Sequence, residues 1–255
     1  MKKLPVKPLL PDKKVLSVLI SSEYPLISQK IRDIWGIEVV EIPYNDKMFT
    51  DIATHADCRF IQVSENCVII DESLKFIIVN YLTINNLNNE IKLIVSEHKI
   101  SSPYPGDVKL NVTVAGNKIL CNTKYIDNSL ENYAKLHQYE LIHVNQGYAA
   151  CSVVLIKENA LITDDESIYK TAVNNGFDCL LIRKGSVVLK GREYGFIGGT
   201  CGMLDKNLIV FTGKLDTHID GDLIKDFLLK YNINYIELSE GPLIDIGGII
   251  PLLQS

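Results

Sequence analysis

The chain has 255 residues, of which 47% are hydrophobic and 22% are charged. This composition excludes a disordered, collagen-like or coiled-coil protein. The 26 basic and 31 acidic side chains give a formal charge of −5, and no long basic stretch is present, so we do not expect a nucleic-acid partner.

The first 14 residues, MKKLPVKPLLPDKK, are predicted to form an N-terminal arm, because prolines and lysines interrupt them before the apolar core of a signal peptide can form. No apolar run approaches the roughly 18–20 residues of a membrane-spanning helix, so no membrane association is expected. The six cysteines are scattered without a C-x-x-C pair, and the five histidines form no cluster at metal-ligand spacing. This pattern favours a cytoplasmic protein without a structural metal.

Taken in chain order, the sequence starts with a predicted strand, helix and strand. VLSVLI at 15–20 is apolar enough for a buried strand. Residues 25–35 read as a helix that begins at a proline and ends before Gly36, and IEVVEI at 37–42 follows as a strand.

From residue 57 onward a short apolar hairpin pattern recurs. The copies begin 50, 43, 50 and 45 residues apart, at Asp57, Asp107, Ala150, Thr200 and Asp245. The first four copies read as strand, tight turn and strand. Their turns are Glu65-Asn66, Ala115-Gly116-Asn117, Lys157-Glu158-Asn159 and Asp205-Lys206-Asn207.

A helix and another strand are predicted after each hairpin. In the third copy Asp164 or Asp165 caps SIYKTAVNN, Gly176 ends the helix, and FDCLLI is the strand. The second and fourth copies repeat this order with SLENYAKL and YELIHV, and with LIKDFLLKY and INYIEL. In the first copy KFIIVNYL fits either a helix or a strand, and IKLIVS follows it.

The fifth copy contains one strand, and the N-terminal strand, helix and strand supply its missing parts. The pattern predicts an α/β fold in which five ββαβ units form a closed propeller with pseudo-fivefold symmetry, completed by the N- and C-terminal segments. Residues 1–255 would then form a single domain. The expected units are 57–106, 107–149, 150–196, 197–242, and 243–255 joined with 15–56.

This architecture resembles the pentein fold of guanidino-group-modifying enzymes, which include deiminases, amidinotransferases and dimethylarginine hydrolases. The segments QGYAACS, YGFIGG, TGKLDTHID and LIDIGGIIPL resemble a bacterial branch of that fold whose activity is not established. The fold also includes the noncatalytic, ribosome-binding translation initiation factor six. Architecture therefore does not decide between an enzyme and a binding protein.

If the first hairpin strands begin at the repeat starts, those residues would form a ring around a central channel. The ring would contain Asp57, Asp107 and Asp245, and the next positions would add Cys58, Cys151 and Cys201. Carboxylates can hold a guanidinium ion through paired hydrogen bonds. A cysteine thiolate can attack the guanidinium carbon, and a histidine can then move the proton.

The resemblance assigns these roles to particular residues. Pentein enzymes carry a His-x-Asp motif at a strand start and the nucleophilic cysteine two units further on, which here selects His55, Asp57 and Cys151. The unit before the histidine supplies a guanidinium-binding acid, which corresponds in part to Asp245 in LIDIGG. The resemblance thus predicts Cys151 and His55 as catalytic, and Asp57, Asp107 and Asp245 as substrate-binding.

An alignment that matches each unit to the deiminase unit at the same place in the chain fits less well. The deiminases carry their cysteine in the last unit, where this chain has Ile246-Gly247-Gly248-Ile249. Their histidine belongs to the middle unit, where Tyr148-Ala149-Ala150 stands, and only Pro105-Gly106-Asp107-Val108 resembles their Gly-Gly-Asp-Val in register. This departure would be explained if the catalytic residues had moved to other units, and also if the catalytic site had been lost.

Other candidates stay open at this point. His218-Ile219-Asp220 repeats the His-x-Asp pattern, but Asp220 is expected to cap a helix, with His218 at the surface. Cys201, between glycines and threonine in GGTCGM, is the alternative nucleophile, whereas the charge of Asp57 would disfavour a Cys58 thiolate. An anionic end of a substrate could contact Arg59, Arg183 or Arg192.

Three functions follow from these observations. The first is a cysteine-dependent hydrolase or amidino-group-modifying enzyme that acts on a small cationic guanidine or amidine and needs no cofactor or metal. The second is a noncatalytic binding or scaffold protein, as the ribosome-binding relative is. The third is a different chemistry built on Cys201 and His218.

Overall fold

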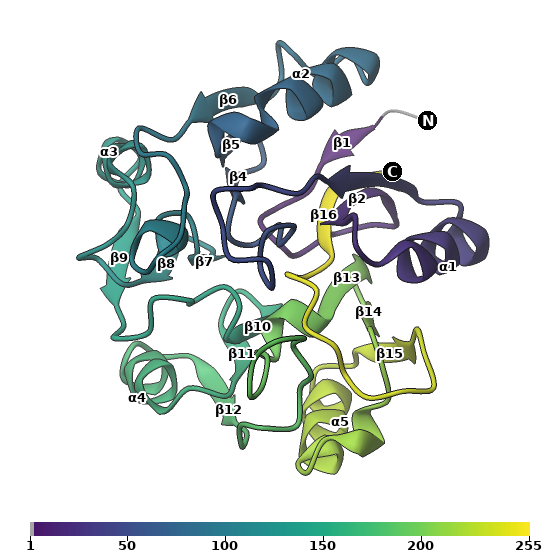
Figure 1. The fold of residues 1–255 in the computed structure, drawn as a ribbon. Helices are drawn as coiled ribbons and strands as arrows, with labels where there is room; N and C mark the ends of the chain where they lie inside the picture. The colour runs from purple at the N-terminus through teal and green to yellow at the C-terminus, as the bar shows by residue number, and fades with distance from the viewer. Residues whose placement is uncertain (1–2) are drawn as a thin grey trace.

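A computed structural model describes residues 3–255, in which apolar strand sequences form five small mixed sheets (Figure 1). Figure 1 shows these sheets around the centre of the molecule, with the α-helices at the periphery. Four sheets contain three strands each. They are β4 (Phe60–Ser64), β5 (Cys67–Ile70) and β6 (Lys92–Val95); β7 (Thr113–Ala115), β8 (Lys118–Cys121) and β9 (Glu140–His143); β10 (Val153–Lys157), β11 (Ala160–Thr163) and β12 (Asp178–Leu181); and β13 (Cys201–Asp205), β14 (Leu208–Phe211) and β15 (Asn234–Glu237).

These four sheets repeat one arrangement, as the sequence predicts. In each, the first two strands form an antiparallel hairpin, and the third pairs in parallel with the second after a helical crossover. The hairpins therefore confirm the expected strand, turn and strand order. Most hairpin residues are buried, whereas the third strands β6, β12 and β15 are partly exposed, because they lie further from the centre.

The fifth sheet joins the two ends of the chain. It contains four strands in the order β1 (Leu4–Pro5), β16 (Ile250–Gln254), β2 (Val15–Ser21) and β3 (Glu38–Ile42). The C-terminal strand β16 is antiparallel to both β1 and β2, so it makes the hairpin partner that the N-terminal segment lacks. Part of the predicted N-terminal arm thus pairs as a strand.

One helix accompanies each sheet. The five are α1 (Pro25–Trp35), α2 (Lys75–Ile84), α3 (Asn128–Leu136), α4 (Glu166–Asn174) and α5 (Gly221–Lys230). The predicted proline start and Gly36 stop of α1 are confirmed. Asp127 and Asp165 cap α3 and α4 by accepting backbone N–H groups, which the ends of a helix leave unpaired. The ambiguous KFIIVNYL segment is the helix α2.

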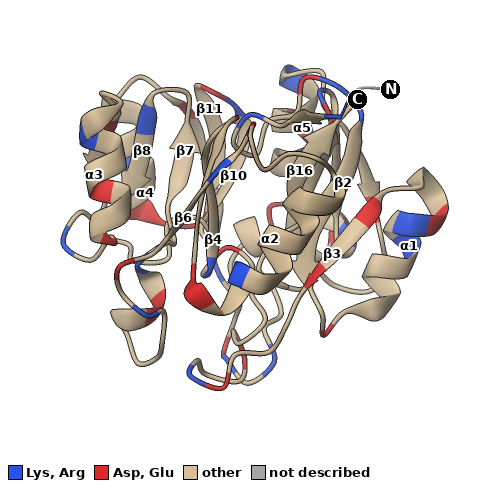
Figure 2. Cartoon of the chain, turned by 90° about the horizontal axis from the view of Figure 1, so that it is seen from above, with Lys and Arg blue, Asp and Glu red and all other residues tan. Residues whose placement is uncertain are grey.

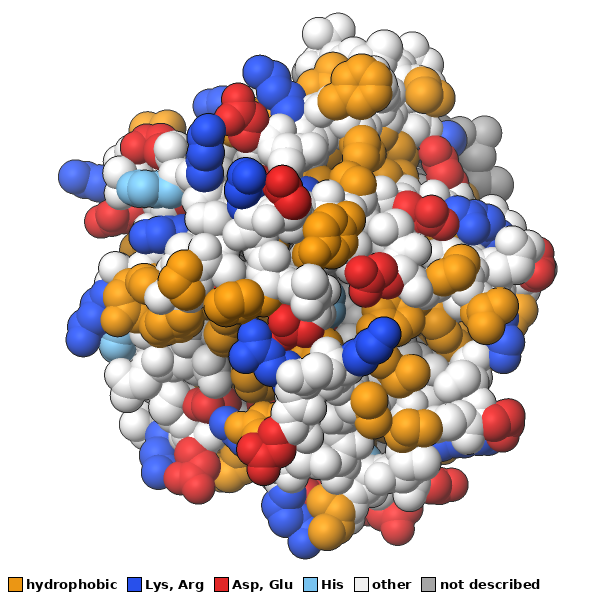
Figure 3. Space-filling view, viewed as in Figure 1, with side chains coloured by type: hydrophobic (Ala, Val, Ile, Leu, Met, Phe, Trp, Pro, Cys, Tyr) orange, Lys and Arg blue, Asp and Glu red, His pale blue; other side chains and the backbone are white. Residues whose placement is uncertain are grey.

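Charged side chains lie mainly on the helices and connecting loops (Figure 2). On the face seen in Figure 3, basic and acidic side chains are interspersed with apolar ones. Among residues 3–255, no helix combines the length and the apolar character that crossing a bilayer would require.

Candidate active site

Three of the predicted site residues line one pocket with a volume of about 260 Å³. His55 comes from the turns before β4, Cys151 from the turn before β10, and Asp245 from the segment before β16. These segments are far apart in the sequence, and the sheets bring them together because their first strands converge at the centre. The rest of the wall is formed by Asp51, Ile52, Tyr148, Leu189, Arg192, Glu193, Tyr194 and Phe196.

The His55 imidazole is buried beside the Asp245 carboxylate. Nδ1 of His55 lies 3.7 Å from Oδ1 of Asp245, an ion-pair distance when the histidine is protonated. Neither ring nitrogen has a hydrogen-bond partner within residues 3–255. The Asp245 carboxylate accepts the backbone N–H groups of Phe196 (2.9 Å) and Gly247 (3.0 Å), which hold it in place. Burial raises the pKa of Asp245.

Asp57 is buried but is absent from the lining that residues 3–255 give this pocket, and it lines a second, apolar cavity instead. One of its carboxylate oxygens and the sulfur atoms of Cys58 and Cys151 lie within 4.8 Å of one another, and all three residues are buried. In the described part of the chain, both Asp57 oxygens are buried without a hydrogen-bond partner. Burying such a carboxylate costs folding free energy unless a cation or a hydrogen-bond donor pairs with it.

Asp107 is separated from the pocket by an aromatic side chain. Its carboxylate accepts the Tyr148 hydroxyl at 3.0 Å and the Ser102 hydroxyl at 3.2 Å. Tyr148 lines the pocket, and Asp107 is absent from the lining that the described residues form. The structure therefore places Asp107 next to the site through Tyr148.

The prediction that the ring residues stand at the starts of strands is wrong in detail. The first hairpin strands begin later than predicted, at Phe60, Thr113, Val153, Cys201 and Ile250. Asp57 follows a series of turns, Asp107 lies in a 3₁₀ helix, and the backbone after Asp245 bonds to Gly199 and Cys201 instead of entering a strand. These loops aim polar side chains inward before each strand starts.

The observed strand starts reveal a site residue that the repeat pattern in the sequence did not indicate. Cys58, Asn111 and Cys151 each stand two residues before the first strand of their hairpin. Nδ2 of Asn111 lies 3.0 Å from the sulfur of Cys151 and 3.5 Å from that of Cys58. Its Oδ1 accepts the backbone N–H groups of Ala150 (2.8 Å) and Cys151 (3.3 Å). The spacing to the hairpin turn does not indicate Asn111, because Asn111 stands 6 residues before Asn117, whereas Cys58 and Cys151 stand 8 residues before Asn66 and Asn159.

Both thiols of this group are held in the neutral form. Burial raises the pKa of Cys151 well above its ordinary value of 9.0, and contact with Cys58 and the Asp57 charge add to the effect. A hydrogen bond from Cys151 lowers the pKa of Cys58, but burial and the charge of Asp57 outweigh it and raise that pKa to about 11. This confirms the expectation that the charge of Asp57 disfavours a thiolate at Cys58.

Replacing Asn111 with leucine is expected to slow alkylation of Cys151 about 10-fold, because a buried thiolate loses its amide donor. Leucine keeps the side-chain volume but cannot donate a hydrogen bond. The measurement is the second-order rate with iodoacetamide at pH 8. Asn122→Leu is the control, because Asn122 is also a buried asparagine but directly follows β8 and donates to the carbonyl of Asn145. An unchanged rate in Asn111→Leu would contradict a role for Asn111 in supporting the thiolate.

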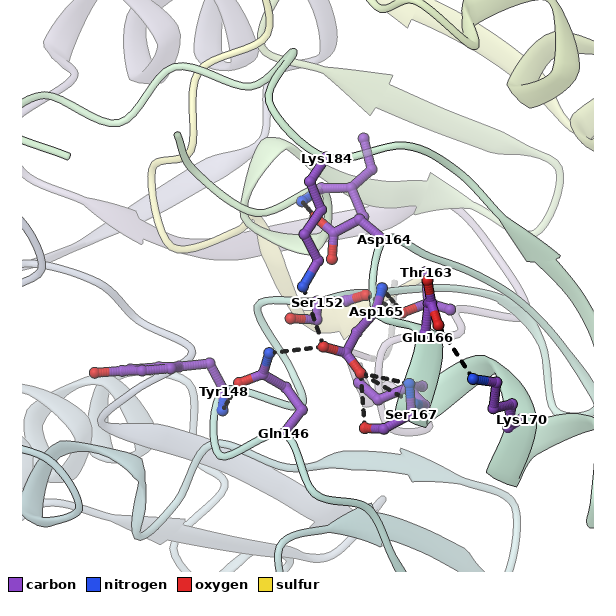
Figure 4. A network of polar contacts seen from close by, with 12 residues as sticks. Gln146, Tyr148, Ser152, Thr163, Asp164, Asp165, Glu166, Ser167, Lys170 and Lys184 are labelled. Carbon is purple, nitrogen blue, oxygen red and sulfur yellow. Dashed lines mark hydrogen bonds and ion pairs between the residues drawn. The ribbon is translucent and has the colours of Figure 1, made fainter. Parts of the chain in front are cut away.

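The loop that carries Tyr148 is fixed to the start of α4. Gln146 donates to Asp165, and its Oε1 accepts the backbone N–H of Tyr148, each at 3.1 Å. Figure 4 shows these bonds together with Lys184, which also contacts Asp165 (3.2 Å). The Tyr148 ring stacks against Phe196 with 5.9 Å between centroids, so two aromatic rings form one side of the pocket.

The alternative pair of Cys201 and His218 is not assembled in one cavity. Cys201 lines an apolar cavity, where the described lining residues include Asp57 but no histidine, and burial raises the pKa of Cys201 to about 12. The expectation that His218 lies at the surface is wrong: its side chain is buried and accepts the backbone N–H of Asp220 at 3.0 Å. Asp220 precedes α5 but does not cap it, because its carboxylate binds Arg183 instead.

The three arginines considered as anion contacts lie in different environments. Arg59 is fully buried and donates to the carbonyls of Pro43 and Ala53, so it holds the turns that carry His55. Arg183 is paired with Asp220, away from the pocket lining. Arg192 lines the pocket, pairs with Asp51 and lies over the Phe49 ring.

Solved structures with the same arrangement of elements define the class of fold. An agmatine deiminase of C. jejuni superposes with a TM-score of 0.53 at 12% identity, covering 92% of this chain and 90% of that one. An inosamine-phosphate amidinotransferase of Streptomyces griseus gives 0.60 at 10% identity, with 99% and 97% covered. An amidinotransferase of the saxitoxin pathway from Microseira wollei gives 0.54 at 10% identity, with 95% and 96% covered. The chain therefore has the mixed α/β fold of the pentein superfamily.

Sequence similarity gives the narrower assignment. Residues 19–250 match the family of unknown function DUF6873, so the chain belongs to that family. No curated protein matches the sequence.

Proposed function

We propose that this protein is a cysteine-dependent enzyme that acts on a C–N bond of a guanidine-like or amidine-like small molecule. The observation that carries the proposal is the convergence of Cys151, His55 and Asp245 on one pocket. A planar cation would pair with the buried carboxylates of Asp57 and Asp245; within residues 3–255, the ion pair given for them is the one between Asp245 and His55, which forms when His55 is protonated. The solved relatives are named as deiminases and amidinotransferases, which supports this general chemistry.

In the proposed reaction His55 takes the proton of the Cys151 thiol, and the sulfur attacks the central carbon of the cation and forms a C–S bond. The C–N bond to one nitrogen then breaks, and that nitrogen leaves as ammonia or an amine after it takes a proton from His55. Water, or an acceptor amine, next attacks the same carbon and gives a proton to His55; the C–S bond breaks, and His55 returns that proton to the departing sulfur, which restores the thiol. Both ring nitrogens of His55 are free of hydrogen bonds to residues 3–255, so the imidazole is available for these transfers.

The finer architecture is part of the same proposal. We infer a closed five-unit propeller and a single domain over residues 1–255, with Asp57 and Asp107 assisting from outside the pocket lining. The pairing of β16 with β1 and β2 and the placement of five sheets around one centre support the closed arrangement.

The neutral resting thiol gives a prediction about pH. Because burial raises the pKa of Cys151, its thiolate is scarce at pH 7, and alkylation by the neutral reagent iodoacetamide should keep rising as the pH passes 9.0. A bound guanidinium favours the thiolate, so a nonreacting guanidine in the pocket should shift this profile to lower pH. The profile is measured by mass spectrometry of the Cys151 peptide. A profile that levels off below pH 7 without ligand would contradict the neutral resting thiol.

The direct test of the function is turnover. Small guanidines and amidines are incubated with the full chain, and the release of ammonia or amine is measured together with the mass of any covalent adduct. Turnover with an adduct on Cys151 supports the proposal. Binding of guanidines without turnover or adduct would favour the noncatalytic binding protein instead.

A further inference from the structure

Next to the pocket, the structure assembles three buried metal-binding side chains from two distant parts of the sequence. We propose that Cys58, Cys151 and Asp57 form a site for one thiophilic divalent cation, of which Zn²⁺ is the natural example and Co²⁺ the spectroscopic probe. This site goes beyond the proposed enzyme function and does not depend on it.

The donor atoms have the chemistry and the spacing that such an ion needs. The two sulfurs and one Asp57 oxygen lie within 4.8 Å of one another. Tetrahedral Zn²⁺ bonds of about 2.3 Å to sulfur and about 2.0–2.2 Å to oxygen place neighbouring donors about 3.3–3.8 Å apart, so small side-chain rotations suffice. Two sulfurs and one carboxylate favour Zn²⁺ or Co²⁺ over Mg²⁺ or Ca²⁺, which prefer shells made of oxygen.

The state of Asp57 is independent evidence for a cation. Both of its carboxylate oxygens are buried, and neither accepts a hydrogen bond from any residue in 3–255. A native protein rarely leaves such a charge without a partner, and a metal ion would supply one. The carboxylate lies beside the two thiols rather than on the wall of the 260 Å³ pocket, so the cation that it indicates belongs with the sulfurs.

The surroundings also suit metal-bound thiolates. The Asn111 amide points its Nδ2 at both sulfurs, at 3.0 and 3.5 Å, as outer-shell donors do in metal sites. Cys151 lies on the pocket wall, which gives an ion a path from solvent to the otherwise buried group. Three protein donors leave a fourth position for water or another small ligand.

The site has a consequence for the pocket. A metal ion bound to Cys151 occupies the sulfur that the proposed enzyme would use as its nucleophile. Metal binding and covalent chemistry at Cys151 are then mutually exclusive. In this way a cation of this class would act as an inhibitor at Cys151.

The test titrates Co²⁺ into the reduced, chelator-treated full chain and follows the sulfur-to-cobalt charge-transfer absorbance. We expect one equivalent to bind, Zn²⁺ to displace it, and Cys58→Ser and Asp57→Asn each to weaken binding by about 100-fold or more. Cys201→Ser is the matched control, because Cys201 is a buried cysteine that does not belong to the group of Asp57, Cys58 and Cys151, and the variant should bind Co²⁺ as tightly as the unmodified chain. Circular dichroism checks that every variant is folded.

A second measurement keeps the proposal testable if a variant fails to fold. In the unmodified chain, Zn²⁺ should protect Cys58 and Cys151 from iodoacetamide and leave the labelling of Cys179 unchanged, since Cys179 is a partly exposed cysteine outside the group. The proposal is overturned if the unmodified chain gives no charge-transfer band, or if Cys58→Ser binds Co²⁺ as tightly as the unmodified chain. The enzyme proposal would survive that result, because labelling and turnover at Cys151 are measured without metal.

Discussion

Replacing Cys151 with alanine is expected to lower turnover of any guanidine or amidine substrate by about 10⁴-fold or more, because the attacking sulfur is lost. The same variant should lose covalent labelling by an amidine-bearing electrophile. Alanine removes only the sulfur, so the turn before β10 and the bonds from Asn111 to the backbone of Ala150 and residue 151 can be kept. Turnover and the intact mass after labelling are the measurements.

The matched control is Cys201→Ala. Cys201 is also buried and stands at the start of the corresponding strand β13, but it lines the separate apolar cavity. This variant should retain labelling and turnover within about twofold. Loss of both activities in Cys201→Ala, with Cys151→Ala active, would move the chemistry to the fourth sheet and contradict the proposal.

Replacing Gly247 with alanine is expected to destabilise the protein by about 2–5 kcal/mol, from backbone strain together with overpacking. Gly247 has a φ of +75°, which favours glycine. An added Cβ would lie 2.5 Å from Cα and Cβ of His55. The variant should therefore also displace His55 and reduce turnover. Urea unfolding, followed by circular dichroism, measures the change in stability.

Gly36→Ala separates strain from collision. Gly36 also has a positive φ, +65°, but a Cβ there meets nothing within 4 Å. This variant should cost only about 1–2 kcal/mol and leave turnover unchanged. Equal losses of stability in the two variants would mean that the contact between Gly247 and His55 is not tight, and that the segment before β16 does not position His55.

Local patterns in the sequence predict the hairpins and most helices, because each is specified by neighbouring residues. Asp165, the proline at residue 25 and Gly36 mark helix ends where the structure has them. The helix α2 is ambiguous in the sequence because apolar residues such as Phe76 and Ile84 remain on its exposed side, so no clear amphipathic pattern arises.

The site is less predictable, because loops before the strands determine it. The 3₁₀ helix at Gly106–Val108 lengthens the second of these loops, so Asp107 falls out of register with Asp57 and Asn111 takes the position of Cys58 and Cys151. The motif predicts His218 at the surface and Asp220 as a helix cap, but Arg183, from the loop after β12, binds the Asp220 carboxylate, and His218 accepts the Asp220 N–H. Contacts of this kind join residues that no short sequence motif connects.

The most direct test of the account is the reactivity of all six cysteines in one sample of metal-free protein. Native and denatured chains are treated with iodoacetamide or with an amidine-bearing electrophile, and the rate at each cysteine is read from its peptide by mass spectrometry. We predict that Cys151 alone reacts faster with the cationic reagent in the native chain than in the denatured one. If no native cysteine exceeds its denatured rate, the pocket does not activate Cys151 toward cations, and the proposed enzyme function is contradicted.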